Sequence, residues 1–360
     1  MKICYLSDAN SIHTKKWCNY FKSKGYEIHV ISLNEGSIPG VKVHSLNMKL
    51  DEVKGRSYFG KFKYITLIGK VKRLVNEIKP DILHAHYASS YGFLGASTGV
   101  HPYIISLWGS DIYDFPKKNI LFKKFLERSL ERADIILSTS RVMADEAKKY
   151  TDKNIEITPF GVDIDLFKPL DDSKKKESDK LIIGTIKAFE KQYGIEDLVK
   201  AFGLLSKKYK NIYLELGGSG SQQGELEQLI KSLGIEDRVK FLGFMPQRSV
   251  VEALNRFNIA VFPSIFESFG VAAVEAQACG IPVIVSNAEG LKEATCPGRS
   301  SIQVEKGNVE QLAEALQELI TNEKLREDMG RFGRIFVEEN FNIKDNFDKV
   351  DRLYRRITII

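Results

Sequence analysis

Two glutamates spaced eight residues apart, Glu267 and Glu275, give the chain its strongest chemical signal. If the segment between them is helical, eight steps of about 100° bring the second side chain back to within roughly 80° of the first, about 12 Å along the axis. Both carboxylates can then border one elongated ligand. The helix start between them offers N–H groups without intrahelical acceptors, at the end of the helix dipole that favours phosphate. The residues expected at this helix start are Ser268, Phe269, Gly270 and Val271.

The order carboxylate, anion site, carboxylate matches a ligand built of sugar, diphosphate and nucleoside. Glu275 is suited to accept hydrogen bonds from ribose hydroxyls, and Glu267 from sugar hydroxyls on the other side of the phosphates. The alternative is an amphipathic helix with two surface glutamates. Small apolar residues surround Glu275, however, and a carboxylate on an otherwise buried helix is unfavourable without a partner. The segment therefore predicts a nucleotide-sugar site.

The elements that must position this site alternate between strand and helix along the whole chain. Apolar runs such as KICYLSD, DILHAHY and YIISLWG are separated by helical segments, and the alternation restarts at LIIGTI. This pattern predicts an α/β fold with parallel sheets covered on both faces. We expect two doubly wound, Rossmann-like domains facing across a cleft, with ligands at the carboxyl ends of the strands. Their expected bounds are 1–167 and 181–342, joined by the polar linker 168–180.

Two histidines lie near the carboxyl end of the run DILHAHY. His86 ends the predicted strand, where parallel sheets place their sites, and is a candidate catalytic residue. His84 is expected to be a packed core histidine instead.

The composition is that of an ordinary globular protein, with 360 residues, 43% hydrophobic and 28% charged, and a net charge of +6. It excludes disordered, collagen-like and coiled-coil proteins, and no apolar run approaches the roughly 18 residues that span a bilayer. The N-terminus lacks the apolar core of a signal peptide, and the cysteines show no CxxC spacing. We therefore expect a cytoplasmic protein with reduced thiols.

Residues 54–79 concentrate basic and aromatic side chains, with Glu77 as the one acidic residue among them. Such a helix can lie on an anionic membrane surface. The alternative is a solvated helix whose apolar stripe faces the core. No nucleic-acid-binding motif accompanies the charge, so a nucleic acid partner is not expected.

The segment 262–286, FPSIFESFGVAAVEAQACGIPVIVS, resembles the E-x7-E motif of family 4 of the retaining glycosyltransferases, which belong to group 1 and adopt the GT-B fold. The resemblance covers almost the whole chain. The first half contributes DILHAHYA, SLWGSDI and TPFGVDIDLFKP, and the second contributes GTIKAFEKQYGIEDLVKAF, LGGSG and VKFLGF, in the family's usual order. It implies that a sugar moves from a nucleotide sugar, such as a UDP- or GDP-sugar, to a glycan or lipid-linked acceptor. Such a protein would act in cell-envelope or exopolysaccharide synthesis, in the cytoplasm or peripherally at the inner membrane face.

By this resemblance, the second domain holds the donor through Glu275 at the ribose, Glu267 at the sugar and backbone amides at the diphosphate. The family's usual Arg position reads Thr185. Lys191 stands at the family's Lys position, and Lys187 is close enough in sequence to replace the Arg, though as a point charge without the bidentate fork.

The resemblance also includes Gly218, within LGGSG, among the donor-binding residues. It further implies that the C-terminal helix, 343–360, packs back onto the first domain.

The first domain departs from the family pattern in two places. Its first loop reads SDANSIHTKKW instead of carrying a Gly-Gly pair, and Asn10 and His13 become candidate hydrogen-bonding residues there. Trp108 stands where the family often has a His beside the sugar; it can stack and donate one N–H but cannot act as a base. Gly109 and Asp111 follow, and Asp111 is expected to contact the sugar or the acceptor.

No metal requirement is expected. The motif Asp163-Ile-Asp165 resembles a metal-binding Asp-x-Asp, but its setting FGVDIDLF matches the family's turn before the linker. The leaving diphosphate can be neutralised by Lys191, Lys187 and the helix dipole. We expect a same-face displacement in which the leaving phosphate helps to deprotonate the acceptor. A sugar-nucleotide 2-epimerase, a retaining sugar phosphorylase and an inactive nucleotide-sugar-binding subunit remain alternatives.

Overall fold

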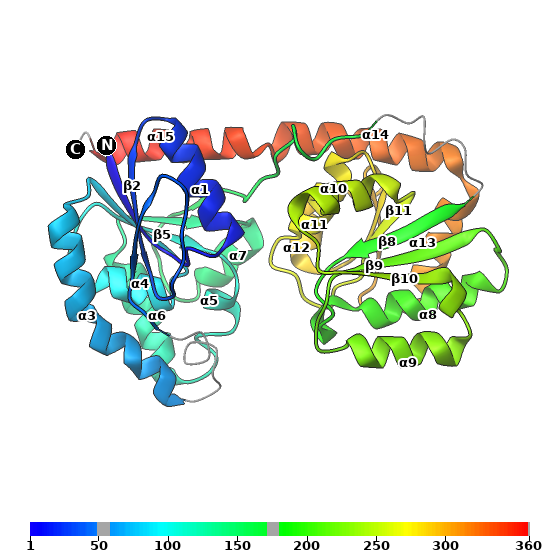
Figure 1. Ribbon diagram of the computed structural model, residues 1–360, viewed down its shortest axis with the longest axis horizontal. Helices are drawn as coiled ribbons and strands as arrows, with labels where there is room; N and C mark the ends of the chain where they lie inside the picture. The colour runs from blue at the N-terminus through cyan, green and yellow to red at the C-terminus, as the bar shows by residue number, and fades with distance from the viewer. Residues whose placement is uncertain (49–57, 171–179, 359–360) are drawn as a thin grey trace. The chain divides into compact units, whose positions relative to one another are not determined.

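The computed structural model describes residues 1–48, 58–170 and 180–358, which form two compact units. The first unit comprises Met1–Phe160 and Asp345–Ile360, and the second Gly161–Lys344. Each is built on its own parallel sheet (Figure 1). This arrangement confirms the predicted α/β class with two Rossmann-like domains. Most of the expected linker, 171–179, lies outside the described residues.

The described part of the first unit contains a seven-stranded sheet in the order β3-β2-β1-β4-β5-β6-β7. Its strands are β1 (Lys2–Leu6), β2 (Glu27–Ser32), β3 (Lys42–Ser45), β4 (Ile82–His86), β5 (Tyr103–Leu107), β6 (Ile135–Ser138) and β7 (Ile155–Ile157). Its helices are α1 (Ile12–Ser23), α3 (Tyr58–Ile78), α4 (Ser90–Ala96), α5 (Ser110–Tyr113), α6 (Ile120–Arg132), α7 (Arg141–Ala147) and α15 (Ile343–Thr358). Every residue of β4 and β5 is buried, as continuous apolar strands covered on both faces should be.

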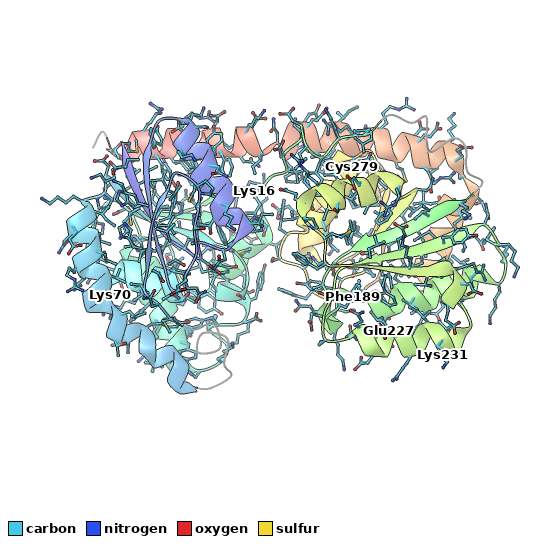
Figure 2. The ribbon with its side chains drawn as sticks, viewed as in Figure 1. Lys16, Lys70, Phe189, Glu227, Lys231 and Cys279 are labelled. Atoms are coloured by element: carbon cyan, nitrogen blue, oxygen red, sulfur yellow. The ribbon has the colours of Figure 1, made fainter. Side chains whose placement is uncertain are left out.

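The described part of the second unit contains a six-stranded sheet in the order β10-β9-β8-β11-β12-β13. Its strands are β8 (Leu181–Ile186), β9 (Ile212–Gly217), β10 (Val239–Gly243), β11 (Ile259–Phe262), β12 (Val283–Ser286) and β13 (Ser301–Val304). Its α-helices are α8 (Ile195–Ser206), α9 (Gln223–Leu233), α10 (Gln247–Arg256), α11 (Val271–Ala278), α12 (Glu289–Ala294), α13 (Val309–Thr321) and α14 (Glu323–Asn340). Two 3₁₀ turns, η2 (Lys191–Tyr193) and η3 (Glu236–Arg238), complete it. The exposed side chains of Glu227 and Lys231 line the outer side of α9 (Figure 2).

The predicted helix at 268–278 begins later than expected. It starts at Val271, because Gly270 adopts a left-handed φ of 101° that breaks a helix. The spacing argument assumed helical residues from Ser268 onward, so its estimate of the angle and distance between the two glutamates does not apply. The turn still places a helix start between them.

Candidate active site

The loop between β11 and α11 ends in a conformation that favours glycine. At the left-handed φ of Gly270, a Cβ would also lie 2.8 Å from Cδ2 of Leu291. The backbone bonds of α11 begin with the amides of Ala273 and Val274, which donate to the carbonyl of Gly270. The amides of 269–271 precede these bonds. They therefore lie at the positive end of the α11 dipole, which favours an anion.

An ion pair joins this loop to the residue that follows β8. Nζ of Lys187 pairs with Oε2 of Glu267, and their side chains are only 16% and 11% exposed. The same Nζ lies 4.3 Å from the ring centroid of Tyr193. Charges this poorly hydrated are unfavourable unless paired. Because a Cβ on Gly270 would lie 3.7 Å from Cγ of Glu267, the pair sits beside the start of α11.

Gly218 brings the loop after β9 against the loop after β8. Its φ is 131°, and a Cβ there would lie 2.0 Å from the carbonyl oxygen of Lys187. Its amide donates to the carbonyl of Gly243 at 2.8 Å. Any other residue at 218 would displace backbone, so the position of Lys187 depends on this glycine.

Lys191 lies at an exposed position at the start of η2. This turn is tied to the loop before α11, because the carbonyl of Gln192 accepts the amides of Ile265 and Phe266 at 2.8 and 3.2 Å. Thr185, at the family's Arg position, is fully buried in β8 and cannot substitute for that Arg.

The remaining donor candidates lie on the loop and on α11 itself. Phe269 is 2% exposed and packs edge-on against Phe341 at 5.3 Å, so it can offer a ligand only its backbone. Ser268, Val271 and Glu275 are half-buried. The structure thus connects Lys187, Gly218, Glu267 and Gly270 through direct contacts, with Glu275 further along the same helix.

The strand ends of β1 and β4 meet at His86. This residue is fully buried, with Nδ1 2.9 Å from Oγ of Ser7, which lies 2.7 Å from Oγ1 of Thr14. Burial, helped by the charges of neighbouring histidines, holds the pKa of His86 well below its usual value. His86 is therefore uncharged near neutral pH.

His84 is a core residue, as predicted. It is fully buried, with Nδ1 2.6 Å from Oη of Tyr354 and Nε2 2.8 Å from Oγ of Ser106. Since Tyr354 belongs to α15, this bond also fastens the C-terminal helix to β4.

Trp108 lies among aromatic rings at the carboxyl end of β5. It stacks on His86 with ring centroids 4.3 Å apart and meets Phe160 edge-on at 5.3 Å. Phe160 in turn stacks on His13 at 4.0 Å. Burial, with a smaller contribution from the charge of Lys16, lowers the pKa of His13 to about 4.

Two buried nitrogens of this aromatic cluster, Nε1 of Trp108 and Nε2 of His86, have no hydrogen-bond partner in the described part of the chain. Both histidines are neutral at pH 7, so the cluster offers stacking faces and single hydrogen bonds without charge. This chemistry suits a sugar ring and its hydroxyls. It does not suit proton transfer by a histidine near neutral pH.

The carboxylate of Asp111 accepts hydrogen bonds from backbone amides, a structural role that the sequence did not indicate. Its side chain is 1% exposed, and Oδ1 accepts the amides of Trp108 and Gly109 at 3.2 and 2.8 Å. Oδ2 accepts the amide of Ala88 at 2.8 Å. Burial raises the pKa of this carboxyl, although the three amides act in the opposite direction. Asp111 thus joins the loops after β4 and β5, and its contact with a sugar stays a prediction.

Asn10 lies exposed in the loop after β1. Its side-chain nitrogen donates to the carbonyl of Glu35 at 2.7 Å, and its amide donates to Oδ1 of Asp8 at 2.9 Å. This loop is therefore held by side chains rather than by glycine.

The sequence interpretation missed Phe160 and Tyr193 as parts of these clusters. Phe160 follows the last strand of the first sheet by three residues, and Tyr193 closes η2 beside Lys187. A search for aromatic residues just after predicted strands, where parallel sheets place ligands, would have identified Phe160.

The Asp-x-Asp motif forms a turn. Oδ1 of Asp163 accepts the amides of Asp165 and Leu166, and Asp165 pairs with Lys344 at 2.6 Å. Within residues 1–48, 58–170 and 180–358, no group of three or more His, Cys, Asp or Glu side chains is arranged to hold a metal ion. The same described ranges contain no helix long and apolar enough to cross a membrane.

Two family models match the chain in succession. The model described as glycosyl transferase 4-like matches residues 2–140, and the model described as glycosyl transferases group 1 matches residues 167–336. The second match includes both glutamates and the start of α11.

Individual relatives agree with these matches. The chain is 28% identical to N-acetyl-alpha-D-glucosaminyl L-malate synthase of Bacillus anthracis, over 92% of this chain and 89% of that protein. Its fold is similar to that of sucrose-phosphate synthase from Thermosynechococcus elongatus, with a TM-score of 0.84 at 21% identity over 99% and 98% of the two chains. Anabaena HepE, solved in complex with UDP and glucose, has a TM-score of 0.79 at 19% identity over 98% and 99%.

Proposed function

Because the chain belongs to the group 1 glycosyltransferases of the family 4 type, we propose that it moves a sugar, with retention of anomeric configuration, from a nucleotide sugar to a glycan or lipid-linked acceptor. The proposed biological role is synthesis of a cell-envelope or exported polysaccharide. The observation that carries this proposal is the Lys187–Glu267 ion pair beside the first amides of α11.

On the donor side, the amides at the start of α11 bind the diphosphate, and Lys187 and Lys191 neutralise the charge that grows as it leaves. Nζ of Lys187 carries three N–H donors, so it can hold Glu267 and a phosphate oxygen together. Glu267 then accepts from a sugar hydroxyl, and Glu275 accepts from the ribose. These groups supply the electrostatic stabilisation without a metal ion, so we propose a metal-independent reaction in which EDTA leaves the rate unchanged.

On the sugar side, Trp108 and His86 form an uncharged wall, with His13 and Asn10 at its rim. Since His86 and His13 are poor bases, the leaving phosphate takes the proton of the acceptor hydroxyl on the same face of the sugar. Asp111 positions the loop that carries Trp108 and Gly109.

A screen of UDP- and GDP-sugars tests this proposal. Thermal shift with each nucleotide identifies the base, and mass spectrometry of candidate acceptors identifies the product. NMR of the new glycosidic bond reports its configuration, and an inverted linkage would contradict the mechanism. A nucleotide sugar incubated alone separates the alternatives, because an epimerised sugar without any acceptor would indicate a 2-epimerase. Disaccharide cleavage that requires phosphate would indicate a phosphorylase.

We further propose peripheral contact with an anionic membrane through 54–79. Residues 54–57 lie outside the described residues. Along α3, Val71, Val75 and Ile78 are buried in the core, which leaves Ile65, Lys72 and Arg73 among the exposed residues. Exposed Lys72 and Arg73 supply charge for such binding, so sedimentation with phosphatidylglycerol vesicles at low salt should fall at high salt. Equal binding to neutral vesicles would contradict it.

A further inference from the structure

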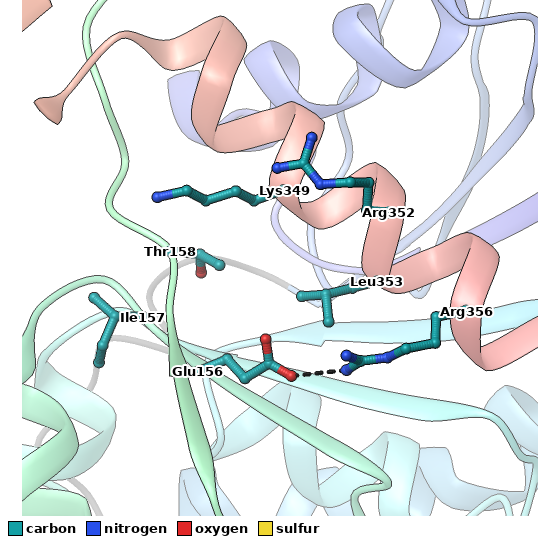
Figure 3. Close-up of a pocket in the computed structure, with 7 residues that line it drawn as sticks. All are labelled: Glu156, Ile157, Thr158, Lys349, Arg352, Leu353 and Arg356. Atoms are coloured by element: carbon teal, nitrogen blue, oxygen red, sulfur yellow. Dashed lines mark hydrogen bonds and ion pairs between the residues drawn. The ribbon is translucent and has the colours of Figure 1, made fainter. Parts of the chain in front are cut away.

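A groove on the first unit carries a basic surface that the proposed donor and sugar contacts leave unused. It lies between the edge strand β7 and α15 and has a volume of about 320 Å³. Lys349, Arg352 and Arg356 line it from α15, and residues 156–158 line it from the opposite side (Figure 3).

Two acids of α15 bond to neighbouring elements of the first unit. Asp348 accepts from Lys24 and from Tyr20 of α1, and Asp351 accepts from Tyr26, the residue directly before β2. These acids fasten the helix to its neighbours. The three cations of the groove are spaced three and four residues apart, a spacing that places side chains on one face of a helix.

One of the three cations is neutralised. A guanidinium nitrogen of Arg356 lies 2.9 Å from Oε1 of Glu156 (Figure 3). Lys349 and Arg352 have no ion-pair partner within 4.0 Å among the residues that the structure describes. Among the residues that line the groove, three cations therefore stand against the one carboxylate of Glu156, and the charge of Arg352 also acts on Asp348, one turn away on the same helix.

The groove adjoins the aromatic cluster of Trp108, His86, Phe160 and His13. Thr158 lines the groove, and Phe160, two residues later, stacks on His13 at 4.0 Å. Two residues of extended chain cover about 7 Å. A short segment of chain therefore joins the lining of the groove to the cluster that we assign to the sugar.

We propose that this groove binds the phosphate of a phosphate-bearing acceptor. The inference rests on the proposed function and narrows it, because it makes the acceptor a phosphorylated sugar or lipid rather than a neutral glycan. Arg352 presents a planar fork that matches two phosphate oxygens, Lys349 adds a point charge, and the hydroxyl of Thr158 is an uncharged donor.

Methyl NMR of the full chain tests the groove directly. Sodium phosphate added at constant ionic strength should shift the methyl resonances of Leu353 and Ile157, which line it. In the double variant Lys349→Gln/Arg352→Gln, the phosphate dissociation constant that the Leu353 methyl resonances report should rise about tenfold or more, because charge-assisted hydrogen bonds are lost. Val271 reports phosphate at α11 separately. An absent shift at Leu353, or an unchanged constant in the double variant, overturns the proposal.

Arg355→Gln is the matched control. It removes the same charge from the same helix, but its side chain pairs with Asp351 at 3.0 Å and faces Tyr26 instead of the groove. It should leave the Leu353 titration unchanged. A rise equal to that of the double variant would mean that the general charge of α15 attracts phosphate, and the groove would lose its role.

Two further probes distinguish the source of the phosphate. Glucose 1-phosphate represents a soluble acceptor, and phosphatidylcholine nanodiscs with polyprenyl phosphate represent a lipid-linked one. Binding of either probe that is tighter than that of its dephosphorylated counterpart, and that weakens in Lys349→Gln/Arg352→Gln but not in Arg355→Gln, supports the groove. Binding that the double variant leaves unchanged overturns it.

The titration needs neither donor nor turnover, so its failure is separable from failure of the proposed function. An inactive chain with an intact Leu353 titration would refute the transferase mechanism alone. An active chain whose KM for the phosphorylated acceptor is unchanged by the double substitution would refute the groove alone.

Discussion

At the strand ends of the second sheet the candidate residues are charged and paired, whereas at the strand ends of the first sheet they are aromatic and neutral. Lys187 and Glu267 form an ion pair that is largely withdrawn from water. His86 and Trp108 stack on each other in a buried cluster, and burial keeps His86 uncharged. The two sites occupy corresponding positions in sheets of the same architecture.

The difference matches the two halves of the proposed reaction. A departing diphosphate gains negative charge, and fixed cations and amides stabilise it best when they are already oriented. A sugar and its acceptor hydroxyl need positioning without a competing charge, which stacking and single hydrogen bonds provide.

Removing the two glutamates separately should give different kinetic defects. Glu267→Ala should lower kcat by about 10²–10³-fold with a smaller effect on donor binding, because we propose that Glu267 contacts the sugar and because it pairs with Lys187. Glu275→Ala should weaken nucleotide binding by roughly ten- to hundredfold, as expected for a lost charge-assisted contact. Steady-state kinetics and nucleotide titrations measure both.

Glu289→Ala is the control for this pair, because its side chain is 63% exposed on α12. It should retain full activity. Wild-type kinetics in Glu267→Ala or in Glu275→Ala would contradict the donor-site role that we propose for that glutamate.

Gly218→Ala should disturb the donor side through the backbone alone. The new methyl group would lie 2.0 Å from the carbonyl oxygen of Lys187, at a φ of 131°. Because the loop must move, kcat/KM should fall by about 10–10²-fold through misplacement of Lys187. Gly224→Ala in α9 is matched in chemistry, but its Cβ meets nothing within 4 Å. That control should be active and slightly more stable, by about 0.5–1 kcal/mol in urea unfolding.

Asp111→Asn tests the aromatic, uncharged region at the strand ends of the first sheet. An amide cannot accept at both ends, so one of the three backbone amides loses its acceptor and the free energy of unfolding should fall by about 1–3 kcal/mol. Asp114→Asn, three residues later and exposed, should not change it. If Asp111→Asn unfolds like the wild type but loses turnover, then Asp111 acts on the substrate and the sugar side is charged after all.

The sequence predicted what short patterns encode. Alternation of strand and helix predicted both sheets, and the carboxylate and glycine pattern at 267–275 predicted a helix start between two acids. The exact start of α11 was not predictable from spacing, since it depends on the left-handed conformation of Gly270. The carboxyl of Asp111 was assigned to a ligand because nothing in SLWGSDI shows that the amides of three separate residues would converge on it. Contacts between distant segments, such as Phe160 on His13, require the fold itself.

The smallest effect concerns the pH dependence of stability on the neutral side. The pKa of His13 is lowered from 6.5 to about 4 in the folded chain. Between these values the unfolded chain binds the additional proton, so His13 contributes its full stability above pH 6.5 and loses it as the pH falls. At pH 5.5 the loss is about 1.4 kcal/mol, and at pH 7.5 almost none. His13→Phe keeps a ring against Phe160. In urea titrations, the difference in the free energy of unfolding between pH 5.5 and pH 7.5 should therefore be smaller in this variant than in the wild type by about 1.4 kcal/mol. An unchanged difference would mean that His13 is solvated and protonates freely, and the sugar side would then carry a charge below pH 6.5.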